Sequence, residues 1–213
     1  MTTLIRPAGP DDSDFIARNI LASQRGPRSR GWFDIALGWP EPQCLAFVAQ
    51  VATAATRSWW HVSQFMIAEL DGEPAAALCA LPATGTGVAG RAAIAEVAEN
   101  TGLSASELAA IFRRGAYASD CWVQGCEGDW LIEHVASLPA YRGRGLVQAL
   151  IARALAAGGA AGFRRASISF LIGNDPAERC YAKAGFVFAE EKRDPVFEAL
   201  TGAPGFRRFV RTI

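Results

Sequence analysis

The stretch from residue 130 to residue 190 constrains the fold most, because its elements begin and end at clear signals. Residues 130–138 form a largely apolar run that Pro139 stops, which predicts a strand. A glycine-rich turn and an alanine- and leucine-rich segment follow, and the latter predicts a helix over residues 145–157 that ends at two consecutive glycines. Residues 165–171 predict a second strand, with apolar side chains gathered on one face.

A further helix begins at a strong start signal, Asp175-Pro176-Ala177-Glu178. Aspartate caps the helix, proline takes the first helical position and glutamate closes a capping box. The helix is predicted to end at Gly185. Residues 186–189 and 206–210 predict the final strands.

In the first part of the chain, the signals that begin and end helices and strands are less clear. Residues 84–129 hold two helical patterns, and Ser104 to Glu107 forms a capping box at the second. We expect an insertion between two strands rather than a separate domain, since about 45 residues bury little core. The other predicted elements are a strand at 4–7, a helix at 11–21, a loop at 24–38, a helix at 40–56, hairpin strands at 64–70 and 75–81, and helical patterns at 91–99 and 104–118.

Composition excludes several classes of protein. Half the residues are apolar (51%) and 20% are charged, which is typical of a globular domain. Lys+Arg and Asp+Glu are both 21, so the basic excess of a general nucleic-acid binder is missing. The longest charge-free run, between Glu73 and Arg91, is short and broken by Pro and Gly, which argues against a membrane span.

The N-terminus and the cysteines predict a cytoplasmic protein. Arg6 and the acids at 11–14 interrupt any apolar core of a signal peptide. Five cysteines without an export signal fit reduced thiols. Cys121 and Cys126 have no matching Cys or His pair, so we expect no metal site.

Two glycine-rich segments compete as phosphate sites. Gly85 to Gly90 matches G-x-G-x-x-G, the dinucleotide fingerprint, and carries the alternative of a nucleotide-dependent oxidoreductase. Its context is poor, because a second helical pattern follows where a βαβ unit needs a parallel strand. Residues 142–147 lie between a strand and a helix start, where uncovered amides, the helix dipole and two arginines form a socket for a phosphate. An ordinary strand-to-helix turn is the alternative.

The residues around the second segment resemble the GNAT superfamily of acetyl-CoA-dependent N-acetyltransferases. The resemblance rests on Pro139 through Gly145 after a strand, then a helix, a strand, and Asn174 through Tyr181 to Gly185-Phe186. The resemblance covers about residues 130–190. The elements predicted before them, a strand, two helices and a hairpin, also follow the order found in the family. Arg142 and Gly145 match the family pattern R/Q-x-x-G-x-G/A, whereas Val147 stands where Gly or Ala is usual.

The resemblance implies an α+β fold: a mixed, mostly antiparallel sheet of six to seven strands flanked by helices. Residues 1–213 would form one acetyltransferase domain, with the helical insertion of 84–129 before the central strand. This insertion is a further departure, because a minimal member of the family lacks it.

Acetyl-CoA would lie in a V-shaped opening between the strands at 130–138 and 165–171, as the resemblance implies. Amides of residues 142–147 would bind its pyrophosphate, and the strand backbone at 135–137 would pair with its pantetheine arm. Asn174 would hold the other side of that arm, or would be a loop residue near a helix cap. The residues expected at acetyl-CoA are Val135, Ala136, Ser137, Arg142, Gly143, Arg144, Gly145, Leu146, Val147 and Asn174.

The chemistry of acetyl transfer adds two requirements. An alkyl ammonium, with a pKa of roughly 10, needs a base before it attacks. The leaving thiolate needs a proton, and Tyr181 matches the general-acid tyrosine in the family's Tyr-x-x-x-Gly-Phe pattern. The alternative for Tyr181 is a half-buried aromatic ring with its hydroxyl in water.

Three residues are candidates for the base. Strand alternation puts Glu133 on the face of Leu131, beside the expected thioester, and His134 on the opposite face. A bulge would exchange the two faces. Asp129, at the strand start, is the third candidate.

Cys180 raises the question of an acyl-cysteine intermediate. It adjoins Tyr181, but neighbours on a helix point about 100° apart, and we interpret it as a small core residue. We therefore expect the acetyl group to pass directly from acetyl-CoA to the amine within a ternary complex. We expect the acceptor site to be built from three parts of the chain: the segment 24–39, the insertion at 84–129 and Trp59-Trp60-His61.

The predicted function is transfer of an acetyl group from acetyl-CoA to a primary amine, on a small molecule or a peptide. We expect neither nucleic acid nor membrane as partner, and homodimer formation stays open. A non-catalytic acyl-CoA-binding regulatory module is the principal alternative. Thiol release with a panel of amines distinguishes the two.

Overall fold

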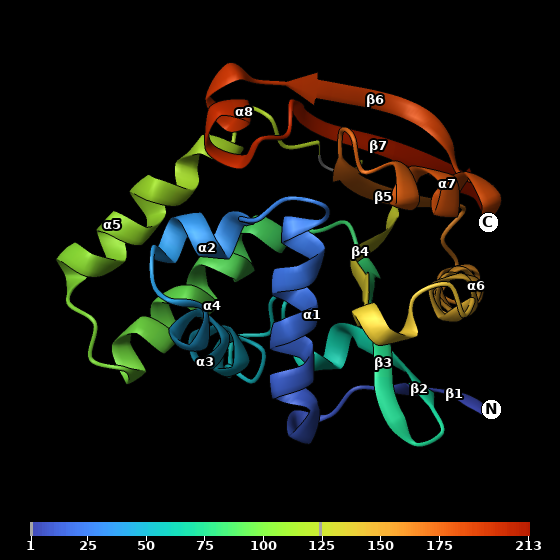
Figure 1. The fold of residues 1–213 in the computed structure, drawn as a ribbon, viewed down its shortest axis with the longest axis horizontal. Coiled ribbons are helices and arrows are strands. Elements are labelled where there is room, and N and C mark those ends of the chain that lie inside the picture. The colour runs from blue at the N-terminus through green and yellow to red at the C-terminus, as the bar shows by residue number, and fades with distance from the viewer. Residues whose placement is uncertain (1, 124) are drawn as a thin grey trace.

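A computed structural model describes residues 2–123 and 125–213 and shows a sheet with helices on both sides (Figure 1). The sheet has seven strands in the order β1-β2-β3-β4-β5-β7-β6. Neighbouring strands pair antiparallel except β4 and β5, which are parallel. This confirms the expected α+β fold with a mixed, mostly antiparallel sheet. The strands are β1 (Thr3–Pro7), β2 (Phe65–Leu70), β3 (Glu73–Pro82), β4 (Trp130–Ser137), β5 (Arg165–Leu171), β6 (Val187–Arg193) and β7 (Gly205–Thr212).

Helices cover the two faces unequally. Figure 1 shows α1 to α4 on one side of β4 and α6 on the other, and each side has its own cluster of buried apolar side chains. The predicted insertion forms α4 and α5 between β3 and β4, and α5 packs on α2. The helices are α1 (Ser13–Arg25), α2 (Trp32–Leu37), α3 (Glu41–Val51), α4 (Thr86–Asn100), α5 (Ala105–Gly115), α6 (Leu146–Ala160), α7 (Asp175–Lys183) and α8 (Pro195–Thr201).

Two helices lie where none was predicted. The expected loop at 24–38 contains α2, because the Asp34 carboxylate accepts from the N–H of Gly31 and closes a capping box there. Between the last two strands, α8 begins at Asp194-Pro195, and the Asp194 side chain accepts from the N–H of Phe197 at 2.7 Å. The same Asp-Pro pair that predicts the start of α7 therefore also begins α8.

Some predicted boundaries were wrong. The two glycines at 158 and 159 do not end α6, which continues to Ala160 before Gly162 takes a positive φ of 88°. The cap of α7 is Asn174 rather than Asp175. Helix α3 ends at Val51, short of the expected residue 56.

A bulge bends β4 at the centre of the sheet. Glu133 pairs with Cys79 and Ala136 with Ala77, so two residues of β4 oppose one of β3. His134 takes a positive φ of 51°, which is strained for a side chain larger than glycine. The buried Asn19 side chain on α1 donates to the His134 carbonyl oxygen at 2.6 Å and holds this conformation.

Candidate active site

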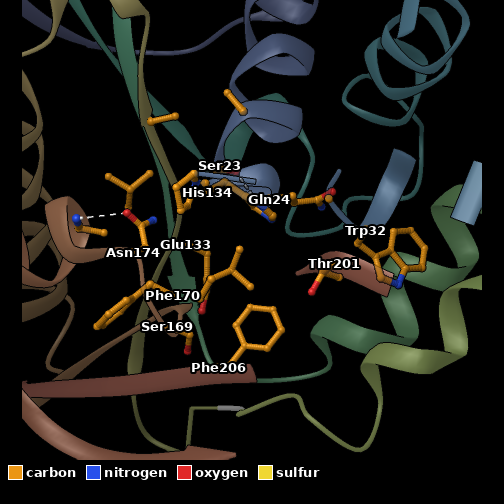
Figure 2. A pocket seen from close by; sticks show the side chains of 18 of the residues that line it. Ser23, Gln24, Trp32, Glu133, His134, Ser169, Phe170, Asn174, Thr201 and Phe206 are labelled. Atoms are coloured by element: carbon orange, nitrogen blue, oxygen red, sulfur yellow. Dashed lines mark hydrogen bonds between the residues drawn. The ribbon is translucent and has the colours of Figure 1, made fainter. Parts of the chain in front are cut away.

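The central feature of the site is an opening between β4 and β5. The two strands pair only from Trp130 with Ala166 to Ile132 with Ile168. Beyond Ile132, β4 keeps its pairing with β3 but pairs with no strand on its β5 side among the described residues. A cavity of about 1040 Å³ lies at this opening (Figure 2).

The cavity has two halves that meet at Glu133 and His134. We call the part lined by residues 135–137, 141–148, 174, 176–177, 179–181 and 183 the α6 half. The other part is lined by segments of 22–32, 59–60, 87–94, 112–122 and 197–206, and we call it the aromatic half. These segments include most of the predicted acceptor region, although His61 does not line the cavity.

The start of α6 forms one end of the α6 half. Gly143 and Gly145 have positive φ values of 75° and 77°, and a Cβ on either would meet no atom within 4 Å. The turn therefore leaves its backbone open to solvent, and the first amides of α6 have no acceptor within the helix. Arg142 and Arg144 are exposed on the same turn. This arrangement favours binding of an anion.

Val147, the departure from the family pattern, lies one residue into the helix. Its side chain is half-buried and packs against the apolar cluster beneath α6, while also lining the cavity. The branched side chain therefore contributes to the core of this face.

The predicted strand contacts lie along the same half. Val135, Ala136 and Ser137 are half-buried and line the cavity. Because their outer edge faces the opening rather than β5, their peptide groups can pair with an extended chain placed there.

Asn174 lies at the edge of the α6 half and caps α7. Its Oδ1 accepts from the N–H of Ala177 at 3.4 Å. Its amide nitrogen is 3.1 Å from the position that a Cβ on Gly26 would take, so the side chain spans the space between α7 and the end of α1. The structure thus places Asn174 both at the cavity and at a helix cap.

Glu133 is a buried carboxyl group at the junction of the two halves. Burial raises the pKa of Glu133 to about 8, against a smaller opposing effect of the Ser169 hydroxyl. A carboxyl group with that pKa changes its charge near neutral pH, as a general base must.

His134 lies on the same face as Glu133, and its expected place on the opposite face was wrong. The bulge inserts a residue, so the alternation of side chains shifts at this point. Its ring contacts those of Trp59 and Phe65 at centroid distances of 5.5 and 6.1 Å, and Nδ1 lies 3.3 Å from the Ser23 hydroxyl. Burial lowers the pKa of His134 to about 3.

Tyr181 reaches the cavity from α7. It is buried, lines the α6 half and packs its ring against Phe170 at 5.4 Å. Burial raises the pKa of the Tyr181 hydroxyl, so it stays protonated. Its neighbour Cys180 contacts Gln148, and burial raises the pKa of that thiol, which works against an activated thiolate.

Asp129, the third candidate base, does not line the cavity. Its buried carboxylate pairs with Arg165 and Arg208 and accepts from the N–H of Cys126 at 2.9 Å. A carboxylate with these partners stabilises the junction of β4, β5 and β7.

The other glycine-rich segment is helical rather than a loop. Gly87 and Gly90 lie inside α4, and only Gly85 precedes it, as the N-cap. The next strand along the chain, β4, runs antiparallel to β3, so the βαβ unit that a dinucleotide fingerprint requires is not formed.

Several lining residues were missed by sequence reasoning. Ser169 on β5, and Phe197 and Phe206 near the C-terminus, all line the cavity. Their places in the sequence carry no motif. For Ser169 a signal did exist, because it lies on the strand expected to border the opening.

The described residues hold neither a cluster of metal-ligating side chains nor a long apolar helix. In the ranges 2–123 and 125–213, no group of three or more His, Cys, Asp and Glu side chains is placed to hold a metal ion. No helix in these ranges has the length and apolar character needed to cross a bilayer.

Solved structures share this architecture. An N-acetyltransferase from Staphylococcus aureus Mu50 is 18% identical with a TM-score of 0.69, and the alignment covers 98% of this chain and 100% of that one. The Drosophila melanogaster polyamine N-acetyltransferase is 14% identical, with a TM-score of 0.54 and 100% of both chains covered. N-acetylglutamate synthase from Neisseria gonorrhoeae, solved with coenzyme A and N-acetylglutamate, is 15% identical, with a TM-score of 0.51, over 100% of this chain and 35% of that one. At these identities the likeness shows the fold.

A search of curated protein sequences finds no significant match to the chain. The sequence model of the Acetyltransferase (GNAT) family, by contrast, matches residues 31–186. That match includes the bulged strand, the turn before α6 and Tyr181, which the geometry brings to one cavity. The chain therefore belongs to the GNAT family of acetyltransferases.

Proposed function

We propose that this protein transfers the acetyl group of acetyl-CoA to a primary amine by direct attack within a ternary complex. One observation carries the proposal. A single cavity joins the anion-binding turn before α6, the free edge of β4, and the side chains of Glu133 and Tyr181. Acetyl transfer requires these four features together: a phosphate site, a channel for the pantetheine arm, a base and an acid.

The α6 half fits acetyl-CoA by shape and by charge. The open backbone at Gly143 and Gly145 leaves room for a pyrophosphate against the amides of the α6 N-terminus. The free edge of β4 suits an arm that carries amide groups of its own. The side chains of this half include four cations and no acid among the described residues, which suits a polyanion: Arg142, Arg144, Arg179 and Lys183.

Glu133 takes the proton in this proposal. The ionised carboxylate accepts a proton from the bound ammonium, directly or through one water molecule. The amine nitrogen then forms a bond to the acetyl carbon while the carbon–sulfur bond breaks. A backbone amide of the bulged strand near Val135 would stabilise the negative charge that develops on the carbonyl oxygen.

Tyr181 supplies a proton to the departing sulfur. Its raised pKa keeps the hydroxyl protonated until the thiolate forms. The same burial destabilises the thiolate and raises its affinity for a proton. The products are an N-acetylated amine and free thiol, and solvent restores the proton of Tyr181 and removes that of Glu133.

The test measures thiol release from acetyl-CoA with a panel of primary amines. We expect Tyr181→Phe and Glu133→Gln each to lower kcat by about 100-fold or more, with binding of coenzyme A unchanged. The control is Asp129→Asn, which changes a carboxyl group outside the cavity and is expected to affect stability more than kcat.

Two results would contradict the proposal. Binding of coenzyme A without thiol release for every amine would favour the acyl-CoA-binding regulatory module. Full activity of Tyr181→Phe would remove the tyrosine from the proton path.

A further inference from the structure

The aromatic half of the cavity has an unusual lining for a site that binds an ammonium group. Eight aromatic side chains of the described residues line it, and we call six of them, which lie far apart in the sequence, the aromatic wall. The aromatic wall consists of Trp32, Trp59, Trp60, Trp122, Phe197 and Phe206.

The rings of the wall touch one another in sequence. Trp32 stacks on Trp60 with centroids 5.9 Å apart, and Trp60 contacts Trp59 at 5.4 Å. Trp59 contacts Trp122 at 5.4 Å, and Trp122 continues to Phe206 at 5.0 Å. This series lines the aromatic half of the cavity, and Figure 2 shows Trp32 and Phe206 at different sides of the pocket that Glu133 also lines.

Negative charge is scarce in the cavity. Glu133 is the sole acidic side chain among the described residues that line it. The cations of the aromatic half, Arg30 and Arg91, are exposed. An acceptor with two or more ammonium groups would find one carboxyl group for the first and none for the others, so it would lose hydration without compensation.

Three buried polar atoms of cavity-lining residues have no partner. The indole N–H groups of Trp59 and Trp60 and Nε2 of His134 are buried without a hydrogen-bond partner in the described part of the chain. All three residues line the cavity. Buried polar groups are normally paired, so a ligand that reaches these atoms with a group able to donate and accept, such as a ring hydroxyl, would satisfy them.

We infer that the acceptor is a monoamine with an aromatic ring, an arylalkylamine, whose ring packs against the aromatic wall while its amino group faces Glu133. This inference rests on the proposed acetyl transfer. Aromatic rings pack favourably on one another beyond their burial. A single ammonium group matches the single carboxyl group.

The first experiment compares amines of matched size and different charge. We expect kcat/KM for tyramine and tryptamine to exceed that for agmatine and spermidine at least tenfold. The paired comparison of 2-phenylethylamine with 2-cyclohexylethylamine isolates aromatic recognition, and we expect the phenyl compound to be about threefold better. Higher activity with agmatine or spermidine, or equal activity with the cyclohexyl compound, overturns the inference.

Two variants locate the binding region. Trp122→Ala is expected to raise KM for tyramine about tenfold and to leave KM for acetyl-CoA unchanged. The matched control is Trp39→Leu, since Trp39 packs against Phe47 away from the cavity and its loss should leave both KM values unchanged. An unchanged KM for tyramine in Trp122→Ala contradicts the inference.

A charge-adding variant tests the other half of the argument. The Gln24 side chain lines the cavity and its Oε1 accepts from the N–H of Phe33 at 3.1 Å, a bond that glutamate can also make. Gln24→Glu should therefore keep the fold, place a second carboxylate near the wall and raise the relative activity with agmatine. No change in the ratio of agmatine to tyramine activity counts against a role for charge.

A binding measurement separates failure of the inference from failure of acetyl transfer. Tyramine and agmatine are titrated into the protein loaded with coenzyme A, and binding is followed by calorimetry. Tighter binding of tyramine without any turnover would overturn the proposed reaction and leave the inferred ligand class standing. Turnover of agmatine with weak binding of tyramine would do the reverse.

Discussion

Glu133 and His134 are adjacent in the sequence, and burial shifts their pKa values in opposite directions. Burial disfavours the charged form of each group, so it raises the pKa of Glu133 to about 8 and lowers that of His134 to about 3. An imidazole with such a low pKa holds a proton weakly and is a poor base at neutral pH. Glu133 is therefore the better candidate to deprotonate the amine.

The pH dependence of the reaction tests this assignment. Because the carboxylate is the active form of Glu133, kcat/KM is expected to rise with pH and to level off above a pKa of about 8. Glu133→Gln should remove this limb along with most of the activity. The limb is measured with a fixed concentration of tyramine between pH 6 and pH 10, where the ionisation of the amine itself adds a second limb near pH 10.

The control for this profile is His134→Gln. His134 is neutral across the range by its lowered pKa, so its replacement should leave the limb near pH 8 in place. If the limb near pH 8 shifts in His134→Gln but remains in Glu133→Gln, His134 rather than Glu133 is the base.

At the scale of elements, the proposed phosphate site depends on the turn that begins α6. Its N-cap, Gly145, has φ of 77°, a conformation that costs other residues about 1–2 kcal/mol. Gly143, two residues earlier, also has a positive φ, of 75°. The positive φ values on either side of Arg144 turn the backbone outward just before the helix.

Gly145→Ala is expected to lower stability by about 1 kcal/mol and to weaken binding of coenzyme A, because the turn relaxes and its amides move. Gly159→Ala provides the matched control in the same helix, where a Cβ meets no atom within 4 Å and φ is not positive. That substitution should raise stability by up to about 1 kcal/mol, with binding of coenzyme A unchanged. Thermal unfolding and titration of coenzyme A measure both; equal binding by the two variants would dissociate the turn from the phosphate site.

For the whole molecule, the buried acid should shape stability as a function of pH. The folded-state pKa of Glu133, about 8, lies above its ordinary value of 4.5, so the folded chain holds this proton more tightly than the unfolded chain. The stabilisation is complete below about pH 4.5 and is lost as the pH rises toward 8. His134 acts at the other end, because its pKa of about 3 makes stability fall as the pH drops below 6.5.

The Tm of Glu133→Gln should therefore rise relative to the Tm of the unchanged protein as the pH increases from 5 to 8. The comparison is made by calorimetry at several pH values, with Glu73→Gln on the exposed start of β3 as control. A constant difference in Tm across the range would mean that Glu133 is ionised in the folded protein.

The sequence by itself determined the elements from 130 to 190, since capping residues, prolines and glycines act locally. It located the strand at 130–138, the turn at 142–147 and the helix that carries Tyr181, and through them the family. It also placed a helical insertion before the central strand. The Asp-Pro start of α8 was equally local, and its repeated signal at Asp194 could have been read in the same way.

Tertiary structure alone decided which side chains meet. The bulge at His134 arises from the register of β4 on β3 and from the bond that Asn19 donates across the core, so strand alternation failed there. Asp129 lies outside the cavity because Arg165 and Arg208 from other strands pair with it. The aromatic wall collects rings from segments as far apart as Trp32 and Phe206, and contacts at that separation follow from packing, which no local pattern records.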